Sequence, residues 1–270
     1  MEPDINDFTK LLDLEQKSSD TYIGLSPTYP WGRVYGGQVV AQGLRAAANT
    51  VESNRFVHSL HAFFIRAGNS DEPIRYEVDR IRDGKSFTTR RVVAHQSGGA
   101  ILSLSCSFQI TENQVNLQES FLPEDAGSPN DFPVKNWTPM IERRPCPNNL
   151  GRSSLWLRIA NPLKSEPIDH ACALAFTSDD SPTESIISSH PRIVDMQDDW
   201  DNYQDLFFGA SLDHSIWFHR PAPADDWQFH DFQSHGLNGG RGLSIGKIFS
   251  ADGIHIATVV QEVLLREKSL

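Results

Sequence analysis

The sequence predicts an α+β fold made of two similar units, each a helix followed by an antiparallel sheet. Two observations carry this prediction. In the first half of the chain an apolar helical segment precedes a series of strand-like runs, and the same order returns in the second half. A proline-rich stretch separates the halves at residues 111–150. Internal duplication is the simplest explanation for an order of elements that occurs twice.

The composition is typical of a globular protein. The chain has 270 residues, of which 39% are hydrophobic and 22% are charged, so a sizeable core can form and wholesale disorder is not expected. The sequence shows neither an apolar run of membrane-spanning length nor a basic and then apolar leader. We therefore expect a soluble, intracellular protein without a membrane span.

Cysteine content and net charge narrow the function classes. Cys106, Cys146 and Cys172 are widely spaced, odd in number and without a C-x-x-C pattern, which argues against a disulfide framework and a cysteine zinc site. The formal net charge of −11 repels polyanions, so we expect no nucleic-acid partner. A small phosphate-bearing ligand needs only local positive charge. Two short stretches provide such charge, at Arg82, Lys85, Arg90, Arg91, Arg241 and Lys247.

The first unit begins with a helix that is expected to start at Gly36. Val40, Leu44, Ala47 and Val51 have helical spacing, and the remaining faces are also apolar or small, which indicates a buried helix. Four strand-like runs follow, at residues 56–66, 73–81, 86–95 and 100–110.

The second unit repeats this order. An alanine-rich stretch from Asp169 to Ser178 is the expected helix. Aligning the halves matches His58–Arg66 with Leu212–Arg220, and it matches Gln109 with Gln261. Sheets wrapped around one apolar helix explain why neither helix has a polar face. The strand-like runs of this unit lie at residues 209–220, 227–235, 241–250 and 254–265.

The proline-rich stretch sets the expected domain boundaries. It has little hydrophobic periodicity, which indicates an irregular connector. We expect an N-terminal unit at 1–115, a connector at 116–150 and a C-terminal unit at 151–270. The prolines of the stretch are Pro123, Pro129, Pro133, Pro139, Pro145 and Pro147.

Five motifs of the chain resemble those of the type II acyl-CoA thioesterases, and they occur in that family's order between about residues 10 and 266. The resemblance implies a double hotdog fold, in which two fused units each have a long central helix wrapped by an antiparallel sheet. It also implies hydrolysis of acyl-CoA thioesters to a carboxylic acid and CoA in fatty acyl-CoA metabolism, with no cofactor. The motifs are Gly36–Gln42 (GGQVVAQ), His58–Phe64 (HSLHAFF), Arg82–Phe87 (RDGKSF), Leu212–Phe218 (LDHSIWF) and Val260–Glu262 (VQE).

The resemblance further implies that an aspartate, a serine or threonine, and a glutamine together hold the attacking water. These roles fall on Asp179, Ser211 and Gln261. A desolvated carboxylate can act as the general base, and a hydroxyl and an amide each offer a donor and an acceptor that orient the water. Each residue also has a structural explanation: a carboxylate at a helix end, a serine at a strand start, and a buried glutamine that satisfies backbone groups.

Further residues are expected to bind the substrate. Backbone N–H groups at a helix N-terminus can stabilise the developing oxyanion, which makes Gly36, Gly37 and Gln38 candidates. The paired glycines are equally suited to close helix packing. The candidates for binding the phosphates of CoA are Arg82, Lys85 and Arg241.

Three segments depart from the usual family pattern and concern substrate choice. The tetrapeptide Arg66–Asn69 (RAGN) stands where Arg-Pro-Gly-Asp is usual. Val263 follows Glu262 where glycine is common, close enough to Gln261 to narrow an acyl pocket. The region between Ile141 and Trp156 is short, which predicts a trimmed first strand in the second unit.

The C-terminal residues bear on the compartment. The chain ends Lys268-Ser269-Leu270, which does not match the peroxisomal Ser-Lys-Leu signal. We expect a cytoplasmic or peroxisomal location, and this terminus does not support import into the peroxisome.

A second class of thioesterase is suggested by Gly242–Gly246 (GLSIG), which fits the G-x-S-x-G nucleophile elbow. The elbow must be followed by a helix and then by an acid and a histidine. Only 24 residues follow Gly246, and they have the pattern of a turn and a strand. We therefore expect Ser244 to be an ordinary strand residue.

Histidines and acidic residues suggest further alternatives. His58 and His61, with His214 and His219 in the matching region, suggest a metal site, but strand residues three apart point to opposite faces.

The segment Glu166–His170 faintly resembles hotdog enoyl-CoA hydratases, which makes such a lyase the best enzymatic alternative. An acyl-CoA binder without catalysis is a third class. The acidic run of Asp195, Asp198, Asp199, Asp201 and Asp205 is expected to be a solvated loop. A duplicated hotdog contains its own pseudo-dimer. The sequence does not decide whether the chain also forms a homo-oligomer.

Overall fold

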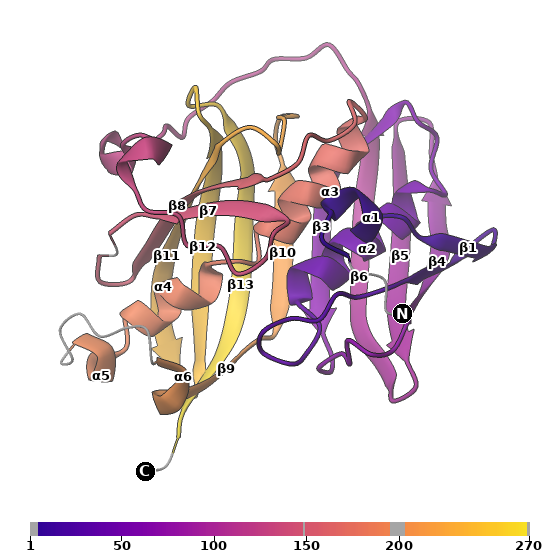
Figure 1. Cartoon of the computed structure of the whole chain (residues 1–270). Helices are drawn as coiled ribbons and strands as arrows, with labels where there is room; N and C mark the ends of the chain where they lie inside the picture. Colours follow the sequence, from indigo (N-terminus) through magenta and orange to yellow (C-terminus); the bar gives the residue numbers. More distant parts are fainter. Residues whose placement is uncertain (1–4, 148, 195–202, 269–270) are drawn as a thin grey trace.

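The computed structural model describes residues 5–147, 149–194 and 203–268, and an antiparallel sheet of 13 strands dominates it (Figure 1). The first half of the chain contributes β1 (Glu15–Ser18), β2 (Thr21–Gly24), β3 (Arg55–Phe64), β4 (Ile74–Asp83), β5 (Phe87–Gln96) and β6 (Gly99–Ile110). The second half contributes β7 (Ile141–Pro145), β8 (Arg152–Ile159), β9 (Phe207–Ser211), β10 (Asp213–Phe218), β11 (Gln228–Asn238), β12 (Arg241–Ser250) and β13 (His255–Glu267).

The strand order is mirrored about the centre of the sheet. It runs β1-β2-β4-β5-β6-β3-β10-β13-β12-β11-β8-β7, and β9 also pairs with β13. The two halves join where β3 pairs with β10, from Phe63 opposite Asp213 to Ser59 opposite Trp217. The sheet is therefore continuous through both halves of the chain.

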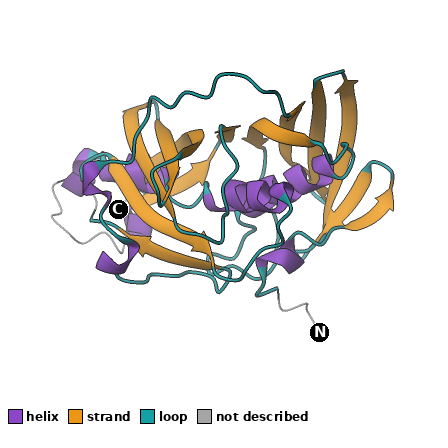
Figure 2. Cartoon of the chain, turned by 90° about the horizontal axis from the view of Figure 1, so that it is seen from above, coloured by secondary structure: helices purple, strands orange, loops and turns teal. Residues whose placement is uncertain are grey.

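Two helices, α2 (Gly36–Ala48) and α3 (Pro167–Thr177), pack against each other between the strands of the two halves (Figure 2). Small and apolar residues cover most of α2, so its faces can be buried against β4, β5 and β6 as well as against α3. Helix α3 ends at Thr177, and after a short break the chain forms α4 (Pro182–Ser188), which packs on β8, β11, β12 and β13. The shorter helices are α1 (Phe8–Leu11), α5 (Pro191–Val194) and α6 (Tyr203–Leu206).

The main core cluster draws on both halves of the chain. Phe8, Leu44, Phe176 and Ile216 are all fully buried in it. The cysteines Cys106, Cys146 and Cys172 are buried and unpaired. Among the described residues, no helix is long and apolar enough to cross a membrane.

Irregularities in the strand pairing recur at a constant spacing. In strands β3 to β6 of the first half the register shifts at Val57/Ser59, Arg80/Arg82 and Ala94/His95; the shift at Gln16/Ser18 in β1 has no such counterpart. In the second half it shifts between Ser211 and Asp213, at Ser234/Leu237 and at Ile248/Phe249. Each shift in the second half begins 154 residues after its counterpart. Bulges have local structural causes, so their repetition relates the two halves residue by residue.

The same pairing corrects one expected match. The last strands of the halves, β6 and β13, correspond at a spacing of 155 residues. Gln261 thus corresponds to Cys106, and the expected match of Gln109 with Gln261 is wrong. Sequence alternation alone cannot fix which residue of a neighbouring strand lies opposite. The pairs that define this spacing are Ala62 with Leu104 and Ile216 with Val259.

The expected helices and strand runs are all present, and α3 covers Pro167–Thr177 where a helix from Asp169 to Ser178 was expected. Four strands were not predicted: β1, β2, β7 and β8. β7 and β8 both form, over 5 and 8 residues, and pair with each other. The expectation that the first strand of this unit is trimmed relative to the family stays a prediction. β7 lies within 116–150, where an irregular connector was expected. Asp195, Asp198, Asp199 and Asp201 lie outside the described residues, as do Ser269 and Leu270.

Candidate active site

Asp179 occupies the junction between the two halves. It follows Ser178, the C-cap of α3, and its carboxylate reaches the start of α2, where it accepts a hydrogen bond from the Gly37 backbone N–H. The N-cap residue of α2, Tyr35, makes no capping side-chain bond. A free helix N-terminus attracts a carboxylate because its first N–H groups lack partners. Asp179 therefore caps α2 from a distant part of the chain.

The ionisation of Asp179 is strongly perturbed. Its side chain is 9% exposed, and burial raises its pKa from 3.8 to about 7. Hydrogen bonds from Gln261, from the Gly37 backbone and from Ser211 act in the opposite direction, because they stabilise the carboxylate. A carboxylate with a pKa near neutrality can take a proton and later return it.

Ser211 and Gln261 complete the group around this carboxylate. The Ser211 hydroxyl donates to Asp179 Oδ1 at 3.4 Å. Gln261, which is fully buried on β13, donates from Nε2 to Ser211 Oγ at 2.7 Å. The structure thus brings together the three residues that the sequence predicted as catalytic, from a helix end and two neighbouring strands.

A bulge makes this arrangement possible. Ser211 ends β9 and pairs with Val263, whereas Ser215 in β10 pairs with Val260. One extra residue therefore lies between the two strands. It turns Ser211 and His214 to the same face of the sheet, although residues three apart on a regular strand face opposite sides.

His214 belongs to the same network and was not predicted as a site residue. It is fully buried; Nε2 lies 2.8 Å from the Ser178 hydroxyl, and Nδ1 contacts Gln261 Oε1. Burial lowers the pKa of His214 to about 4, against a smaller opposing effect of the bond to Gln261. The ring is therefore neutral at physiological pH. The Leu212–Phe218 motif contains His214, but the sequence alone suggests only a metal ligand at this position.

A buried ion-pair cluster fixes the segment that carries Asp179. The next residue, Asp180, accepts from Arg143 Nε at 2.6 Å and from Trp137 Nε1 at 2.5 Å. Arg143 also donates to Glu184 at 2.7 Å. These bonds anchor the break between α3 and α4 to β7 and to the loop before it, so the carboxylate of Asp179 is held in place by rigid neighbours.

Gly36, Gly37 and Gln38 lie at the site in different ways. The Gly37 N–H is used by Asp179, so it serves the carboxylate and is not a free donor for an oxyanion. The Gln38 side chain is fully buried away from Asp179 and bonds to Tyr29 and Ser26. Gly37 also fits closely: a Cβ there would lie 2.3 Å from the Phe176 carbonyl oxygen.

Gly36 is a sensitive test of the site geometry. A Cβ at Gly36 would lie 2.6 Å from Asp179 Oδ2 and 3.0 Å from the Phe64 ring. We expect Gly36→Ala to displace the carboxylate and to lower kcat of any reaction that uses this carboxylate about 10-fold or more, since small misplacements at reacting centres are costly. The control is Gly98→Ala, because a Cβ there meets nothing within 4 Å. Equal kcat values for both variants would contradict this geometry.

The three cations predicted to bind phosphate do not form one cluster. Arg82 and Lys85 are exposed at the β4–β5 turn, which is tied to the C-terminal end of α2 because Arg90 bonds both Asp83 and Thr50. Asp179 lies at the opposite end of α2. Arg241 begins β12 beside α4 and is paired with Glu262 at 2.9 Å.

The G-x-S-x-G pattern has a packing explanation. Ser244 is fully buried in mid-strand and its hydroxyl lies 2.8 Å from that of Ser185 on α4. A Cβ at Gly242 would lie 2.4 Å from Ile186, and one at Gly246 would lie 2.3 Å from Phe232. The two glycines therefore let α4 and β11 approach β12, and the expectation that Ser244 is an ordinary strand residue is confirmed.

The other alternative sites are occupied by structural contacts. Asp169 forms an ion pair with Arg45, and His170 Nδ1 accepts from the Ala224 backbone N–H at 3.1 Å. His58 packs edge-on against a phenylalanine ring, and His61 lies 3.1 Å from the Ser215 hydroxyl. In the described part of the chain, no group of three or more His, Cys, Asp or Glu side chains could hold a metal ion.

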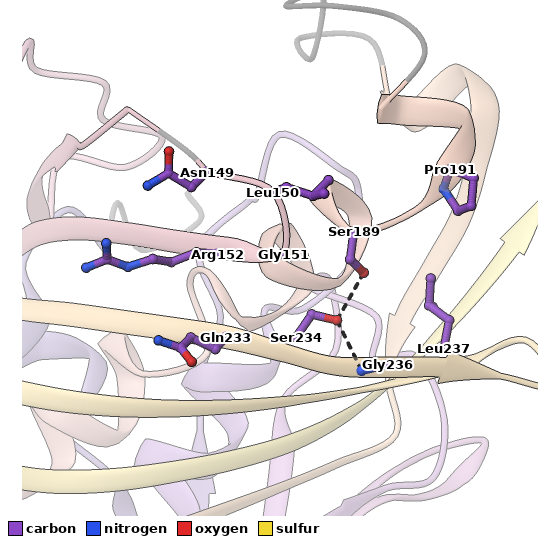
Figure 3. Close-up of a pocket in the computed structure, with 10 residues that line it drawn as sticks. All are labelled: Asn149, Leu150, Gly151, Arg152, Ser189, Pro191, Gln233, Ser234, Gly236 and Leu237. Carbon is purple, nitrogen blue, oxygen red and sulfur yellow. Dashed lines mark hydrogen bonds between the residues drawn. The ribbon is translucent and has the colours of Figure 1, made fainter.

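A groove of about 620 Å³ lies apart from this site (Figure 3). Polar and apolar residues after α4 and along β11 line it, among them Ser189, Ser234 and Leu237, and the two serine hydroxyls lie 3.0 Å apart. None of Asp179, Ser211 and Gln261 lines it. The α4 helix, roughly 10 Å long at 1.5 Å per residue, separates the groove from the Asp179 segment.

Family models match both halves of the chain. The acyl-CoA thioesterase N-terminal domain matches residues 25–109, and the acyl-CoA thioesterase C-terminal domain matches residues 119–265. Acyl-CoA thioesterase 2 of Haemophilus influenzae is 32% identical, over 97% of this chain and 98% of its own length. Human acyl-coenzyme A thioesterase 8 is 31% identical, over 96% of this chain and 89% of its own length.

Solved structures agree with these matches. The acyl-CoA thioesterase II TesB2 of Mycobacterium marinum has a TM-score of 0.81 and 35% identity, over 97% of this chain and 98% of its own. A hot dog fold protein of unknown function from Alicyclobacillus acidocaldarius has a TM-score of 0.78 at 18% identity, over 97% of this chain and 98% of its own, which shows the fold. A shorter match is the peroxisomal acyl-coenzyme A thioester hydrolase 1 of Saccharomyces cerevisiae, 30% identical over 41% of this chain and 32% of its own length.

Proposed function

The chain belongs to the type II acyl-CoA thioesterase family, and from this premise we propose that it hydrolyses acyl-CoA through a water held by Asp179, Ser211 and Gln261. The products are a free carboxylic acid and CoA. The observation that carries the proposed roles is the buried Asp179 carboxylate, whose pKa is raised to about 7 and which lies within hydrogen-bonding reach of the other two side chains.

The proposed hydrolysis needs one ionisable group, Asp179, which takes up one proton and returns it. Asp179 takes a proton from the water as its oxygen attacks the thioester carbonyl carbon. The C–S bond of the tetrahedral intermediate then breaks, and the proton on Asp179 passes to the departing CoA thiolate. Ser211 and Gln261 orient the water without changing their protonation. Among the first N–H groups of α2, those of Gly36 and Gln38 are the proposed oxyanion donors, because Asp179 uses that of Gly37.

We propose that the chain contains the hotdog fold twice, as two fused units that each have a central helix. The mirrored strand order and the bulges repeated at 154 residues support this reading. The proposed boundaries remain 1–115, 116–150 and 151–270, with the family models ending at residue 109 and beginning at residue 119. On this basis Ser211, His214 and Gln261 have counterparts in the first unit, namely Val57, Leu60 and Cys106.

These counterparts imply one catalytic site in each chain. All three are buried and apolar or weakly polar, so they can neither hold a water nor orient a carboxylate. The second unit thus supplies the polar network, and the first unit supplies the N-terminus of α2. This division explains why both units are needed for a single site.

The substrate pocket is proposed to be narrowed by Val263. This residue is fully buried, directly opposite Ser211 in the sheet, and it packs in an apolar cluster with Ile186, Ile187 and Phe207. A glycine at this position would leave room beside the reacting carbonyl. We propose Arg82, Lys85 and Arg241 as separate contacts for phosphate groups. An intracellular location, cytoplasmic or peroxisomal, stays a prediction.

The proposed activity is tested by incubating the protein with a panel of acyl-CoAs of different chain length and measuring free thiol. We expect release of CoA from at least one acyl-CoA, and Ser244→Ala should keep turnover within a few-fold, since strand substitutions without a special role cost little. A burst of CoA equal to the enzyme concentration that disappears in Ser244→Ala would indicate a covalent acyl-enzyme instead. No thiol release from any acyl-CoA would reject the function.

A further inference from the structure

A continuous chain of hydrogen bonds extends behind the proposed water site. It runs from the Ser178 hydroxyl to His214 Nε2 at 2.8 Å, from His214 Nδ1 to Gln261 Oε1, from Gln261 Nε2 to Ser211 Oγ at 2.7 Å, and from Ser211 to Asp179 Oδ1 at 3.4 Å. Ser178, His214 and Gln261 are fully buried. Water is therefore excluded from these members, and each must find its partner within the chain.

The direction of each bond follows from the end at the carboxylate. An ionised Asp179 only accepts, so Ser211 must give it its single proton and must accept from Gln261. Gln261 must then present its NH₂ group to Ser211 and its carbonyl oxygen to His214. A carbonyl oxygen requires a donor, so His214 must carry its proton on Nδ1 and accept at Nε2 from Ser178.

If every hydrogen bond in this chain ran in the opposite direction, Asp179 would lose its bond from Ser211. The Ser178 hydroxyl also lies 3.2 Å from the Ala175 carbonyl oxygen, and a proton given there would require His214 to be protonated at Nε2. Gln261 would then turn its NH₂ group to His214 and its carbonyl to Ser211. Ser211 would donate to Gln261 and leave the carboxylate of Asp179 without that bond. The histidine tautomer thus decides which way the glutamine faces.

We propose that His214 is a positioning residue that, as the Nδ1–H tautomer, fixes the amide of Gln261 so that Ser211 and Gln261 present the water to Asp179. This inference rests on the proposed function and adds a residue to it. His214 itself touches neither water nor substrate. The low pKa of about 4, caused by burial, agrees with a neutral ring at the pH of catalysis.

Three substitutions of His214 separate positioning from packing. Asparagine places an amide N–H near the position of Nδ1, whereas glutamine reaches toward Ser178 and leaves the Nδ1 position empty. We expect His214→Gln and His214→Ala to lower kcat about 10- to 100-fold with KM within about 3-fold, as for other partners that orient a catalytic group. His214→Asn should stay within about 5-fold of wild type.

The control is His230→Asn. His230 is as fully buried as His214 but lies on β11, separated from β13 by β12, and its ring nitrogens make no hydrogen bond to the described residues. Thermal unfolding of all variants measures the loss of packing, and kcat of His230→Asn should equal that of wild type. Equal kcat values for His214→Asn, His214→Gln and wild type would overturn the inference about His214 while leaving thioester hydrolysis intact.

The tautomer can be measured without turnover. In a ¹⁵N spectrum of wild type with His214 assigned by comparison with His214→Asn, we expect a pyrrole-type signal from Nδ1 and a pyridine-type signal from Nε2. The reverse assignment would overturn the proposal whatever the activity. Failure of wild type to release CoA from any acyl-CoA would instead reject the proposed function, so the two results are distinguishable.

Discussion

Asp179→Asn is expected to lower kcat for acyl-CoA hydrolysis by about 10²- to 10⁴-fold, the usual contribution of a general base. The amide keeps the size of the side chain and loses the basic lone pair, so substrate binding should persist. The control is Asp231→Asn, because both aspartates are 9% exposed but Asp231 pairs with Arg152 on the neighbouring strand β8. More than about a third of wild-type turnover in Asp179→Asn, with chemistry rate-limiting, would reject Asp179 as the base.

The same substitution should change stability in a pH-dependent manner. The pKa of Asp179 is raised in the folded state, from 3.8 to about 7, by burial. Folding therefore favours the protonated group, and stability is lost as the pH rises between these two values, by about 4 kcal/mol in total. Asp179→Asn cannot ionise, so its stability relative to wild type should increase between pH 4 and pH 8, as measured by urea unfolding.

Gln261→Ala is expected to lower kcat about 100-fold, because the amide orders the reacting groups. KM should change less, since Gln261 is proposed to place the water and not to grip CoA. A loss confined to KM would point to substrate binding instead. The substitution also leaves Ser211 and His214 without their shared partner, so some loss of stability should accompany it.

A double-mutant cycle tests whether the two residues act on one water. The variant carrying both Asp179→Asn and Gln261→Ala should be about as slow as Asp179→Asn alone, because residues that act as a unit are strongly non-additive. Losses that multiply would show that Gln261 contributes independently of the base.

Hydrophobic pattern was enough to predict the elements that carry the core. The buried residues of α2 and the alternating strands β5 and β12 fall within the expected ranges. The strands that were missed lack that signal. All four residues of β1 are exposed, and β8 buries Ser153 and Ser154 together with apolar neighbours, so neither shows a regular alternation.

The proposed catalytic residues could be predicted only through the resemblance, because an aspartate, a serine and a glutamine have no spacing that marks a site. Their convergence depends on the bulge between Ser211 and Asp213 and on the junction of α3 with the start of α2, which are long-range features. His214 was missed as a site residue for the same reason: its partners lie 36 and 47 residues away along the chain.

The pH dependence of CoA release tests the central claim most directly. An Asp179 with a pKa near 7 must be ionised to accept a proton, so kcat/KM of wild type should rise with the ionised fraction and level off above about pH 8. In Asp179→Asn the residual rate should be far lower and lack that transition. A wild-type profile with no transition near pH 7, or the same transition in Asp179→Asn, would contradict water attack assisted by Asp179.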